Sequence, residues 1–199
     1  MAMQRGAGLQ DSNMRAFIAI KIPEDVLSEL PRVQDRLRRS GVEASWVRPG
    51  GIHLTLKFLG EVDESQQGEI FDALQKAAAG ISRFRIAVAG AGAFPNSRNA
   101  RVIWIGITGD LAPLATLHAA IEEAMAGLGF KREDRKFTPH LTLARIRQGR
   151  SQSKLQTTLE EIKDTSLSAF EVAGVSFMKS DLQPSGSVYT ELGRVELGS

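Results

Sequence analysis

The tetrapeptide His-Leu-Thr-Leu occurs twice in this chain, at residues 53–56 and again at residues 140–143. Two of the three histidines in the chain head the two copies. Because successive side chains of a strand point to opposite faces, each copy predicts a strand with its leucines toward a core and its polar residues on the other face. The four polar residues of the two copies are His53, Thr55, His140 and Thr142.

The sequence around the two copies indicates an internal duplication. A single copy would fit an ordinary half-buried strand, since Thr is a good strand former. The two copies lie 87 residues apart, and the same offset aligns Phe-Ile-Ala-Ile at 17–20 with Trp-Ile-Gly-Ile at 104–107. Each of these apolar segments is followed by a helical pattern and then by the motif, which is typical of a repeated unit. We therefore expect two related halves that face each other across a groove.

The hydrophobic periodicity predicts an α+β fold. We expect it to be bilobal, with largely antiparallel sheets flanked by helices and one His-x-Thr strand in each half. The predicted strands cover residues 14–20, 53–59, 84–88, 102–108, 138–144, 170–178 and 188–192. The predicted helices lie within residues 23–41, 63–80, 110–128 and 155–162.

Several local features of these elements are also predicted. Pro31 should kink or restart the first helix. Asp63, with Gln66 three residues later, resembles a capping box, and Asp110 should cap the third helix. Residues 90–96 are Gly-rich but lack a dinucleotide or P-loop fingerprint, so we interpret them as a hairpin loop.

Composition excludes several classes of site. The chain has no cysteine, which rules out disulfides, thiolate metal sites and cysteine nucleophiles. It also lacks His-x-His, Asp-x-Asp and Gly-x-Ser-x-Gly, so we expect no metal, no cofactor and no serine-hydrolase chemistry. A net charge of +2 and a pI of about 9.1 are compatible with a polyanionic ligand.

The chain reads as one domain after a short tail. Residues 1–13 are rich in Gly and polar residues, and we expect them to be disordered. Residues 14–199 should form a single bilobal domain, monomeric and without a membrane partner. No apolar run is long enough to span a membrane and no signal peptide is evident, so a cytoplasmic location is expected.

Two histidines and two hydroxyls in one groove favour phosphoryl chemistry. Because the pKa of histidine lies near 6.5, one ring can accept a proton while the other donates one. Threonine hydroxyls beside them can donate hydrogen bonds to the non-bridging oxygens of a phosphate.

The motifs and their flanks resemble those of the two-histidine phosphoesterase superfamily. The residues that carry the likeness are 46–49, 53–60, 92–95 and 138–145. Within the superfamily the chain is most similar to bacterial RNA 2',3'-cyclic phosphodiesterases, also called 2'-5' RNA ligases (LigT-like). The resemblance implies metal-independent opening of an RNA terminal 2',3'-cyclic phosphate to a 2'-phosphate, with weak reverse joining through a 2'-5' linkage.

The resemblance also implies roles for individual residues. His53 matches the general acid for the leaving 3'-oxygen, and His140 matches the base that activates water. Thr55 and Thr142 match the hydroxyls that hold the phosphate.

Three further positions are candidates for substrate binding. Phe58 and Arg145, each five residues beyond its histidine, match positions that stack on the terminal base. Strand alternation alone would not place them on the histidine face. Alternation does place Lys57 on that face, where it would either contact phosphate or be an ordinary solvated lysine.

The sequence leaves alternative substrates open. The chain could belong to the same superfamily and act on 2',5'-linked oligoadenylate or on nucleotide cyclic phosphates. It could also be a non-catalytic module that binds RNA or nucleotides. The expected partners are therefore RNA 3' ends or nucleotide cyclic phosphates.

We predict that a chelator leaves the activity unchanged, because the sequence offers no cluster of metal ligands. The measurement is turnover of a 2',3'-cyclic phosphate with and without excess EDTA. Loss of turnover that a single divalent ion restores would contradict the two-histidine mechanism.

Overall fold

The computed structural model of the chain describes residues 13–146, 153–184 and 186–199. Its strands are β1 (Asn13–Lys21), β2 (Ala44–Trp46), β3 (His53–Asp63), β4 (Phe84–Phe94), β5 (Val102–Gly109), β6 (His140–Ile146), β7 (Ser166–Val172), β8 (Gly174–Gln183) and β9 (Gly186–Glu196). Its α-helices are α1 (Glu24–Arg38), α2 (Gln67–Ala78), α3 (Leu111–Gly127) and α4 (Ser153–Ile162). Two 3-10 turns, Pro49–Gly51 and Glu64–Gln66, precede β3 and α2.

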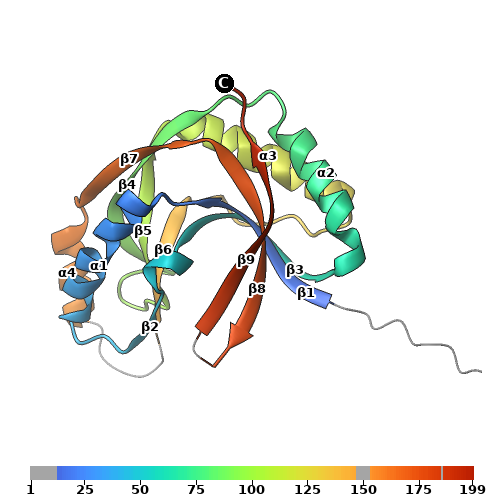
Figure 1. The fold of residues 1–199 in the computed structure, drawn as a ribbon. Coiled ribbons are helices and arrows are strands. Elements are labelled where there is room, and N and C mark those ends of the chain that lie inside the picture. The colour runs from blue at the N-terminus through green and yellow to red at the C-terminus, as the bar shows by residue number, and fades with distance from the viewer. Residues whose placement is uncertain (1–12, 147–152, 185) are drawn as a thin grey trace, which may run out of the picture.

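The strands form one continuous antiparallel sheet with the order β7-β4-β5-β6-β3-β1-β8-β9, and β2 pairs with β6 at its side. We call β3, β1, β8 and β9, with α2 and α3, the first lobe. The second lobe comprises β6, β5, β4, β7 and β2, with α1 and α4. The two lobes lie on opposite sides of the line where β3 meets β6 (Figure 1). The predicted α+β, bilobal fold with one motif strand in each lobe is confirmed.

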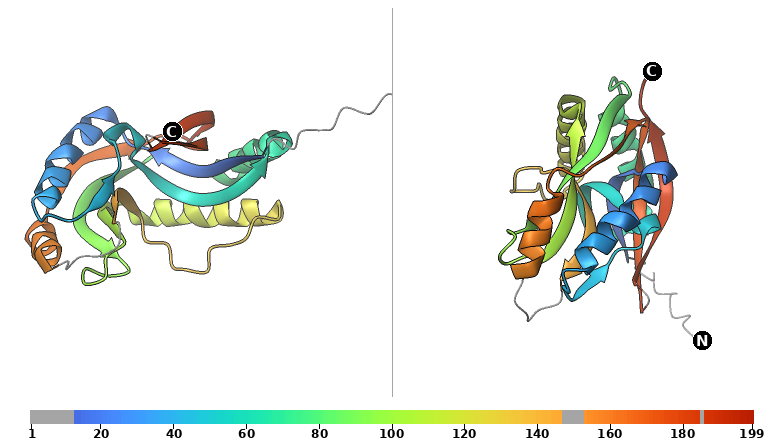
Figure 2. Two further views of the ribbon diagram at one scale, coloured as in Figure 1. Left: turned by 90° about the horizontal axis from the view of Figure 1, so that it is seen from below. Right: turned by 90° about the vertical axis from the view of Figure 1, so that its left-hand side faces the viewer.

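The two halves of the sequence exchange elements between the lobes. Strand β4 follows β3 in the chain but pairs with β5 and β7 of the second lobe. Strand β8 follows β7 but pairs with β1 and β9 of the first lobe. The helices cross over too, since α1 packs against β7 and α4, and α3 packs against α2 and β3 (Figures 1 and 2). Each lobe is thus built from both halves of the chain.

The motif leucines are buried, as predicted. Leu54 and Leu56 of β3 and Leu141 and Leu143 of β6 belong to the main hydrophobic core, to which all four helices contribute. A second, smaller cluster lies apart from this core and contains Phe17, Ala19, Met178 and the partly buried Tyr189. The sheet therefore has one face packed under the helices and another face, which we call the open face, that carries a small aromatic cluster.

Two predicted segments differ from the structure. The strand expected at 170–178 is two strands, because the chain leaves the second lobe at Ala173 and enters the first. The loop expected at 90–96 is mostly strand, because β4 continues to Phe94 beyond an irregularity between Val88 and Ala91. Gly90 lies within that irregularity and has a positive φ of 74°, and Gly92 lies beyond it opposite Trp104, where an ideal Cβ would be 2.3 Å from the indole ring.

The helix ends also differ from expectation. Helix α1 continues through Pro31, and its buried side carries Leu27, Leu30, Val33 and Leu37 against the core, which outweighs one lost backbone hydrogen bond. Asp110 precedes α3 without a side-chain capping bond. Asp63 does accept a hydrogen bond from the backbone N–H of Ser65, but it caps the 3-10 turn rather than α2 itself.

The expected disordered tail lies outside the described residues except for Asn13, which begins β1. Among the residues that the structure describes, no helix combines the length and the apolar character that crossing a membrane requires.

Candidate active site

The two motif strands meet at a single recorded pair, Leu54 of β3 with Leu141 of β6, in antiparallel orientation. That register places His53 opposite Thr142 and Thr55 opposite His140, and residues opposite each other share a face. The two histidines are then diagonal neighbours, a relation that spans roughly 7–8 Å in antiparallel sheets. Because the leucines face the core, all four polar residues belong to the open face.

Each imidazole is oriented by the backbone carbonyl two residues before it. The Nδ1 of His53 lies 2.9 Å from the Gly51 oxygen, and the Nδ1 of His140 lies 2.7 Å from the Thr138 oxygen. A carbonyl can only accept, so Nδ1 must carry the hydrogen in both rings. The same tautomer is thereby fixed twice, and Nε2 is the nitrogen left to exchange a proton with a ligand.

Aromatic side chains hold both rings in place. His53 stacks on Phe17 at 4.6 Å between ring centroids and meets the edge of Tyr189 at 5.0 Å. His140 meets Phe94 edge-on at 4.9 Å and lies 6.2 Å from Trp104. Phe17 and Trp104 are the aromatic residues aligned by the 87-residue offset. The alignment of the two halves could therefore have indicated that each motif histidine has an aromatic neighbour at this position.

Burial makes both histidines hard to protonate in the empty protein. It lowers the pKa of His53 to about 4, against a smaller opposing effect of the Gly51 hydrogen bond. Burial also lowers the pKa of His140, with the Thr138 hydrogen bond opposing it. The positive charge of Arg145 lowers the pKa of both rings further, which indicates that its guanidinium lies near both. At neutral pH both imidazoles are neutral.

The two motif strands carry the same bulge. The pairing of β3 with β1 shifts at Leu56, between Thr55 and Lys57, and the pairing of β6 with β5 shifts at Leu143, between Thr142 and Ala144. A bulge inserts one residue into a strand, so the alternation of faces is reversed beyond it. The pattern of buried and exposed residues over 53–58 then matches that over 140–145 position by position.

These bulges bring Phe58 and Arg145 to the open face, which strand alternation alone would not do. Phe58 is 68% exposed and its ring lies 6.2 Å from that of Phe17, which stacks on His53. Arg145 is exposed and near both histidines.

The expectation that Lys57 shares the face of His53 is wrong, because the same bulge turns its side chain inward. Lys57 is 4% exposed, and its Nζ donates to both carboxylate oxygens of Glu122 in α3, each at 2.9 Å. It is therefore part of the protein interior and not of the open face.

The strand register adds a residue that the sequence did not reveal. Lys21 of β1 lies opposite His53 and so shares the open face, where its Nζ is 3.0 Å from Glu191 of β9. Glu191 also accepts a hydrogen bond from the buried Ser176 of β8. Such cross-strand neighbours depend on which strands pair, and no motif in the sequence states that.

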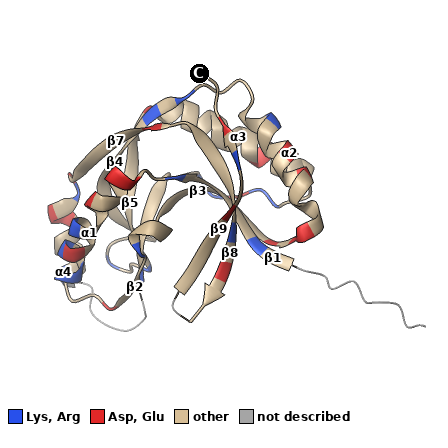
Figure 3. Ribbon diagram, viewed as in Figure 1, with Lys and Arg blue, Asp and Glu red and all other residues tan. Residues whose placement is uncertain are grey.

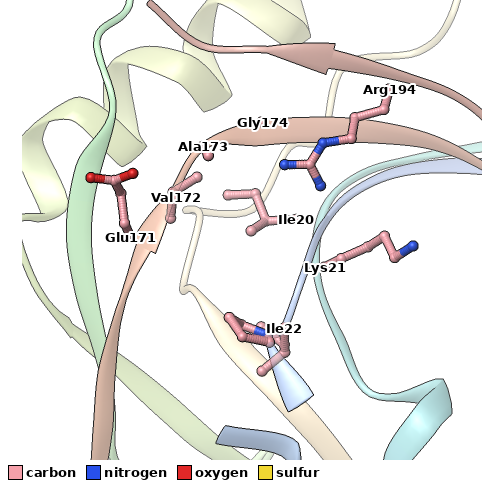
Figure 4. Close-up of a pocket in the computed structure, with 9 residues that line it drawn as sticks. Ile20, Lys21, Ile22, Glu171, Val172, Ala173, Gly174 and Arg194 are labelled. Carbon is pink, nitrogen blue, oxygen red and sulfur yellow. The ribbon is translucent and has the colours of Figure 1, made fainter. Parts of the chain in front are cut away.

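One further hollow of the described surface lacks a pair of histidines of this kind. This cavity of about 250 Å³ lies where β1 ends and the chain crosses from β7 to β8 (Figure 4). Its charged residues each have an ion-pair partner: Lys21 with Glu191, Arg194 with Glu196 two residues along the same strand, and Glu171 with Arg83 just before β4. Within residues 13–146, 153–184 and 186–199, no group of three or more His, Asp or Glu could hold a metal ion.

Charge on the outer helices is mixed in sign. Both α1 and α4 carry acidic and basic residues (Figure 3), and on α1 Arg38 forms an ion pair with Asp35 and Arg32 with Glu29, each one turn apart. These two helices therefore give no broad attraction for nucleic acid.

The site and its duplication coincide with a known family. A family model described as LigT like phosphoesterase matches residues 20–104 and again residues 105–189, with one histidine motif in each segment. The chain belongs to the LigT-like phosphoesterase family. Two LigT-like repeats therefore supply the two motif strands.

Named relatives agree with this assignment. The chain is 32% identical over 179 residues to an RNA 2',3'-cyclic phosphodiesterase of Methanothermobacter thermautotrophicus, covering 90% of this chain and 96% of that protein. It is 36% identical over 176 residues to one of Methanocaldococcus jannaschii, covering 88% and 96%. The crystal structure of TT0787 of Thermus thermophilus matches with a TM-score of 0.77 at 28% identity, covering 94% of this chain and 100% of that one. Escherichia coli LigT, solved with 3'-AMP, shares the LigT-like fold with a TM-score of 0.72 at 21% identity.

We predict that the His53 ring of the free protein stays neutral down to about pH 4, as burial requires. In the unfolded chain the same ring takes up a proton near pH 6.5. Acidification from about pH 6.5 to about pH 4 should therefore lower the free energy of unfolding, because only the unfolded state binds this proton.

The measurements are an NMR titration of the ring and denaturant unfolding across this range, with His53→Gln as the comparison. The variant should lose part of the pH dependence. A His53 ring that titrates at or above 6.5 would contradict the buried environment described here.

Proposed function

We propose that this chain hydrolyses the 2',3'-cyclic phosphate at RNA 3' ends to a 2'-phosphate, by acid–base catalysis with two histidines and without a metal ion. The observation that carries the proposal is the pair of identically oriented imidazoles on one face of the sheet, each with a threonine opposite it. The names of the relatives supply the substrate class, since those proteins are RNA 2',3'-cyclic phosphodiesterases.

The proposed steps use the two Nε2 atoms. His140 takes a proton from a water molecule as the water oxygen bonds to phosphorus, and His53 gives a proton to the 3'-oxygen as its bond to phosphorus breaks. The entering and leaving oxygens lie on opposite sides of phosphorus, so the acid and the base must come from two separated positions. Diagonal neighbours on β3 and β6 meet this requirement, and solvent returns both rings to their starting protonation.

The threonines complete the phosphate site. Thr55 and Thr142 lie between the two histidines on the same face, each opposite the histidine of the other strand. We propose that their hydroxyls donate to the non-bridging oxygens of the phosphate, whose charge grows in the transition state.

The role of His53 as general acid requires that its ring be protonated when substrate is bound. His53 must be protonated to act as acid, yet burial lowers its pKa to about 4 in the empty protein. The negative charge of a bound phosphodiester stabilises an imidazolium beside it, so binding must raise the pKa of His53. A His53 ring that stayed neutral in the bound state could not supply the proton that the leaving 3'-oxygen needs.

The residues beyond the bulges fit a terminal nucleotide. Phe58 offers an exposed ring on one motif strand and Arg145 a guanidinium on the other, and both groups stack on bases. A 5'-hydroxyl that enters in place of water would give a 2'-5' linkage through the same steps, which is the reverse joining that the family resemblance implies.

The site is complete within one chain, because both histidines and both threonines come from it. We therefore propose a monomer as the active form. A cytoplasmic location belongs to the same proposal, since cellular RNA is the substrate.

The deciding experiment is incubation with an oligoribonucleotide that ends in a 2',3'-cyclic phosphate, with the product analysed by phosphorus NMR. A 2'-phosphate product supports the proposal, and a 3'-phosphate product would overturn the assignment of the leaving oxygen. Faster turnover of 2',5'-oligoadenylate or of a mononucleotide cyclic phosphate would assign another substrate. Binding without turnover would make the chain a nucleotide-binding module.

We predict that His53→Ala and His140→Ala each reduce kcat by roughly 10²–10⁴-fold, the usual contribution of one general acid or base. The double variant should be far less than multiplicatively worse, because the two residues act as a unit. The measurement is single-turnover cleavage, with circular dichroism to verify folding. Near-normal turnover in either single variant would remove that histidine from the mechanism.

We predict that Arg145→Ala raises KM more than it lowers kcat, because the guanidinium attracts and stacks on the substrate. The pKa of both histidines should rise in this variant, since Arg145 lowers both. Arg32→Ala is the control, because Arg32 forms an exposed pair with Glu29 on helix α1 and should leave KM and both pKa values unchanged. Unchanged KM in Arg145→Ala would show that this side chain does not contact the substrate.

A further inference from the structure

Buried polar side chains lie directly beneath the two bulged motif strands. In the first lobe they are Lys57 of β3 and Glu122 of α3, and in the second lobe the buried polar residue is Gln34 of α1. Polar groups are buried only at a cost that their hydrogen bonds must offset, so the partners of these residues indicate what they are for.

We call the hydrogen bonds of Lys57 and Glu122 the first-lobe clamp and those of Gln34 the second-lobe clamp. The clamp in the first lobe joins the strand of His53 to the segment that precedes His140. Lys57 Nζ donates to both Glu122 oxygens and to the Lys131 carbonyl, each at 2.9 Å. Glu122 Oε2 also accepts from the backbone N–H of Glu133 at 3.2 Å. Lys131 and Glu133 belong to the segment that continues to Thr138, whose carbonyl orients His140.

The same segment has a second attachment to α3. The ring of His118 stacks on Phe137, with 3.9 Å between centroids and 11° between planes. Phe137 immediately precedes Thr138, so α3 holds the segment before His140 both near its start and at its end.

The clamp in the second lobe makes the converse connection. Gln34 is 2% exposed, and its Nε2 donates to the carbonyls of Val47 at 2.8 Å and Leu143 at 3.1 Å. Leu143 is the bulge residue of β6, the strand of His140. Val47 lies shortly before Gly51, whose carbonyl orients His53.

We propose that Lys57, Glu122 and Gln34 are positioning residues that set how the two imidazoles are placed relative to each other. Each clamp ties the strand of one histidine to the backbone that orients the other, so neither ring can shift without the other motif. In the catalysed reaction, which rests on the proposed function, a misplacement of about 1 Å can cost on the order of 10²-fold in rate.

A purely structural role is the competing explanation, and it makes a different prediction. A buried ion pair contributes little net stability, and apolar residues of similar volume often replace it without loss. If Lys57 and Glu122 served stability alone, a well-packed apolar pair in their place would keep both Tm and kcat. If they position the backbone, the apolar pair would keep Tm but not kcat, because the Lys131 carbonyl and the Glu133 N–H would still lack their hydrogen-bond partners.

The first test compares two identical substitutions at neighbouring positions of α3. Glu122→Gln should lower kcat by roughly 10–100-fold with KM changed by less than about threefold, because binding groups stay in place while the reacting rings are misaligned. Glu123→Gln is the matched control: it removes the exposed pair of Glu123 with Arg132 in the same preceding segment and should keep kcat. Equal kcat in Glu122→Gln and in the control would overturn the role of Glu122.

The second test separates positioning from stability. Lys57→Met should lower both Tm and kcat, whereas the double variant Lys57→Met/Glu122→Leu should recover Tm and still show the lowered kcat. Recovery of kcat together with Tm in the double variant would overturn the proposal.

The third test does not depend on turnover. Nitrogen-15 NMR of the imidazoles reports whether Nδ1 keeps its hydrogen, which the Gly51 and Thr138 carbonyls fix in the folded protein. Lys57→Met should disturb the His140 ring more than the His53 ring, and Gln34→Leu should disturb the His53 ring more than the His140 ring. Ring signals unchanged in both variants would overturn the proposal. If the two variants showed this crossed pattern while the unsubstituted protein had no turnover, the positioning role would be kept and the proposed function rejected.

Discussion

The short contact between β3 and β6 is the constraint on which the rest of the structure depends. It joins the two lobes into one sheet through Leu54 and Leu141, and it fixes the register of the two motifs at the same time. A slip of one residue would send a histidine into the core and a leucine onto the open face, because strand faces alternate with a period of two. The buried leucines beneath both motifs therefore stabilise the fold and set the geometry of the site together.

The bulges at Leu56 and Leu143 extend what a strand can present on one face. Beyond each bulge the inward position is occupied by Lys57 in one strand and Ala144 in the other, so the two halves have diverged inside while they keep the same geometry outside. The outward positions have diverged as well, to an aromatic ring at Phe58 and a guanidinium at Arg145. A duplicated backbone thus carries two different exposed side chains beside an identical pair of histidines.

The sequence alone predicts those features of the fold that depend on strand alternation and on the internal repeat. The motif strands, the burial of their leucines and the bilobal α+β fold all follow from patterns a few residues long. The differences at Lys57 and at residues 166–183 share one cause, which is that they depend on partners distant in the chain. Alternation placed Lys57 on the face of His53. That placement was wrong because the bulge at Leu56 arises from pairing with β1, which the local sequence does not show. The division of residues 166–183 into β7 and β8, and the place of Lys21 beside His53, likewise require the sheet order. Phe58 and Arg145 could be named from family resemblance, and the structure adds the physical reason for their place.

The exchange of strands and helices between the lobes limits how this protein can move. A protein of two lobes joined by one linker opens and closes as a hinge around its ligand. Here the chain passes repeatedly from one lobe to the other, with α1 and β4 in the second lobe and α3 and β8 in the first. A hinge would have to break the β3–β6 contact and shear several crossing segments at once. We therefore expect the two motif strands to keep their relative position when a ligand binds, so that differences between ligands are met by rotation of exposed side chains such as Phe58 and Arg145 and not by closure of the lobes.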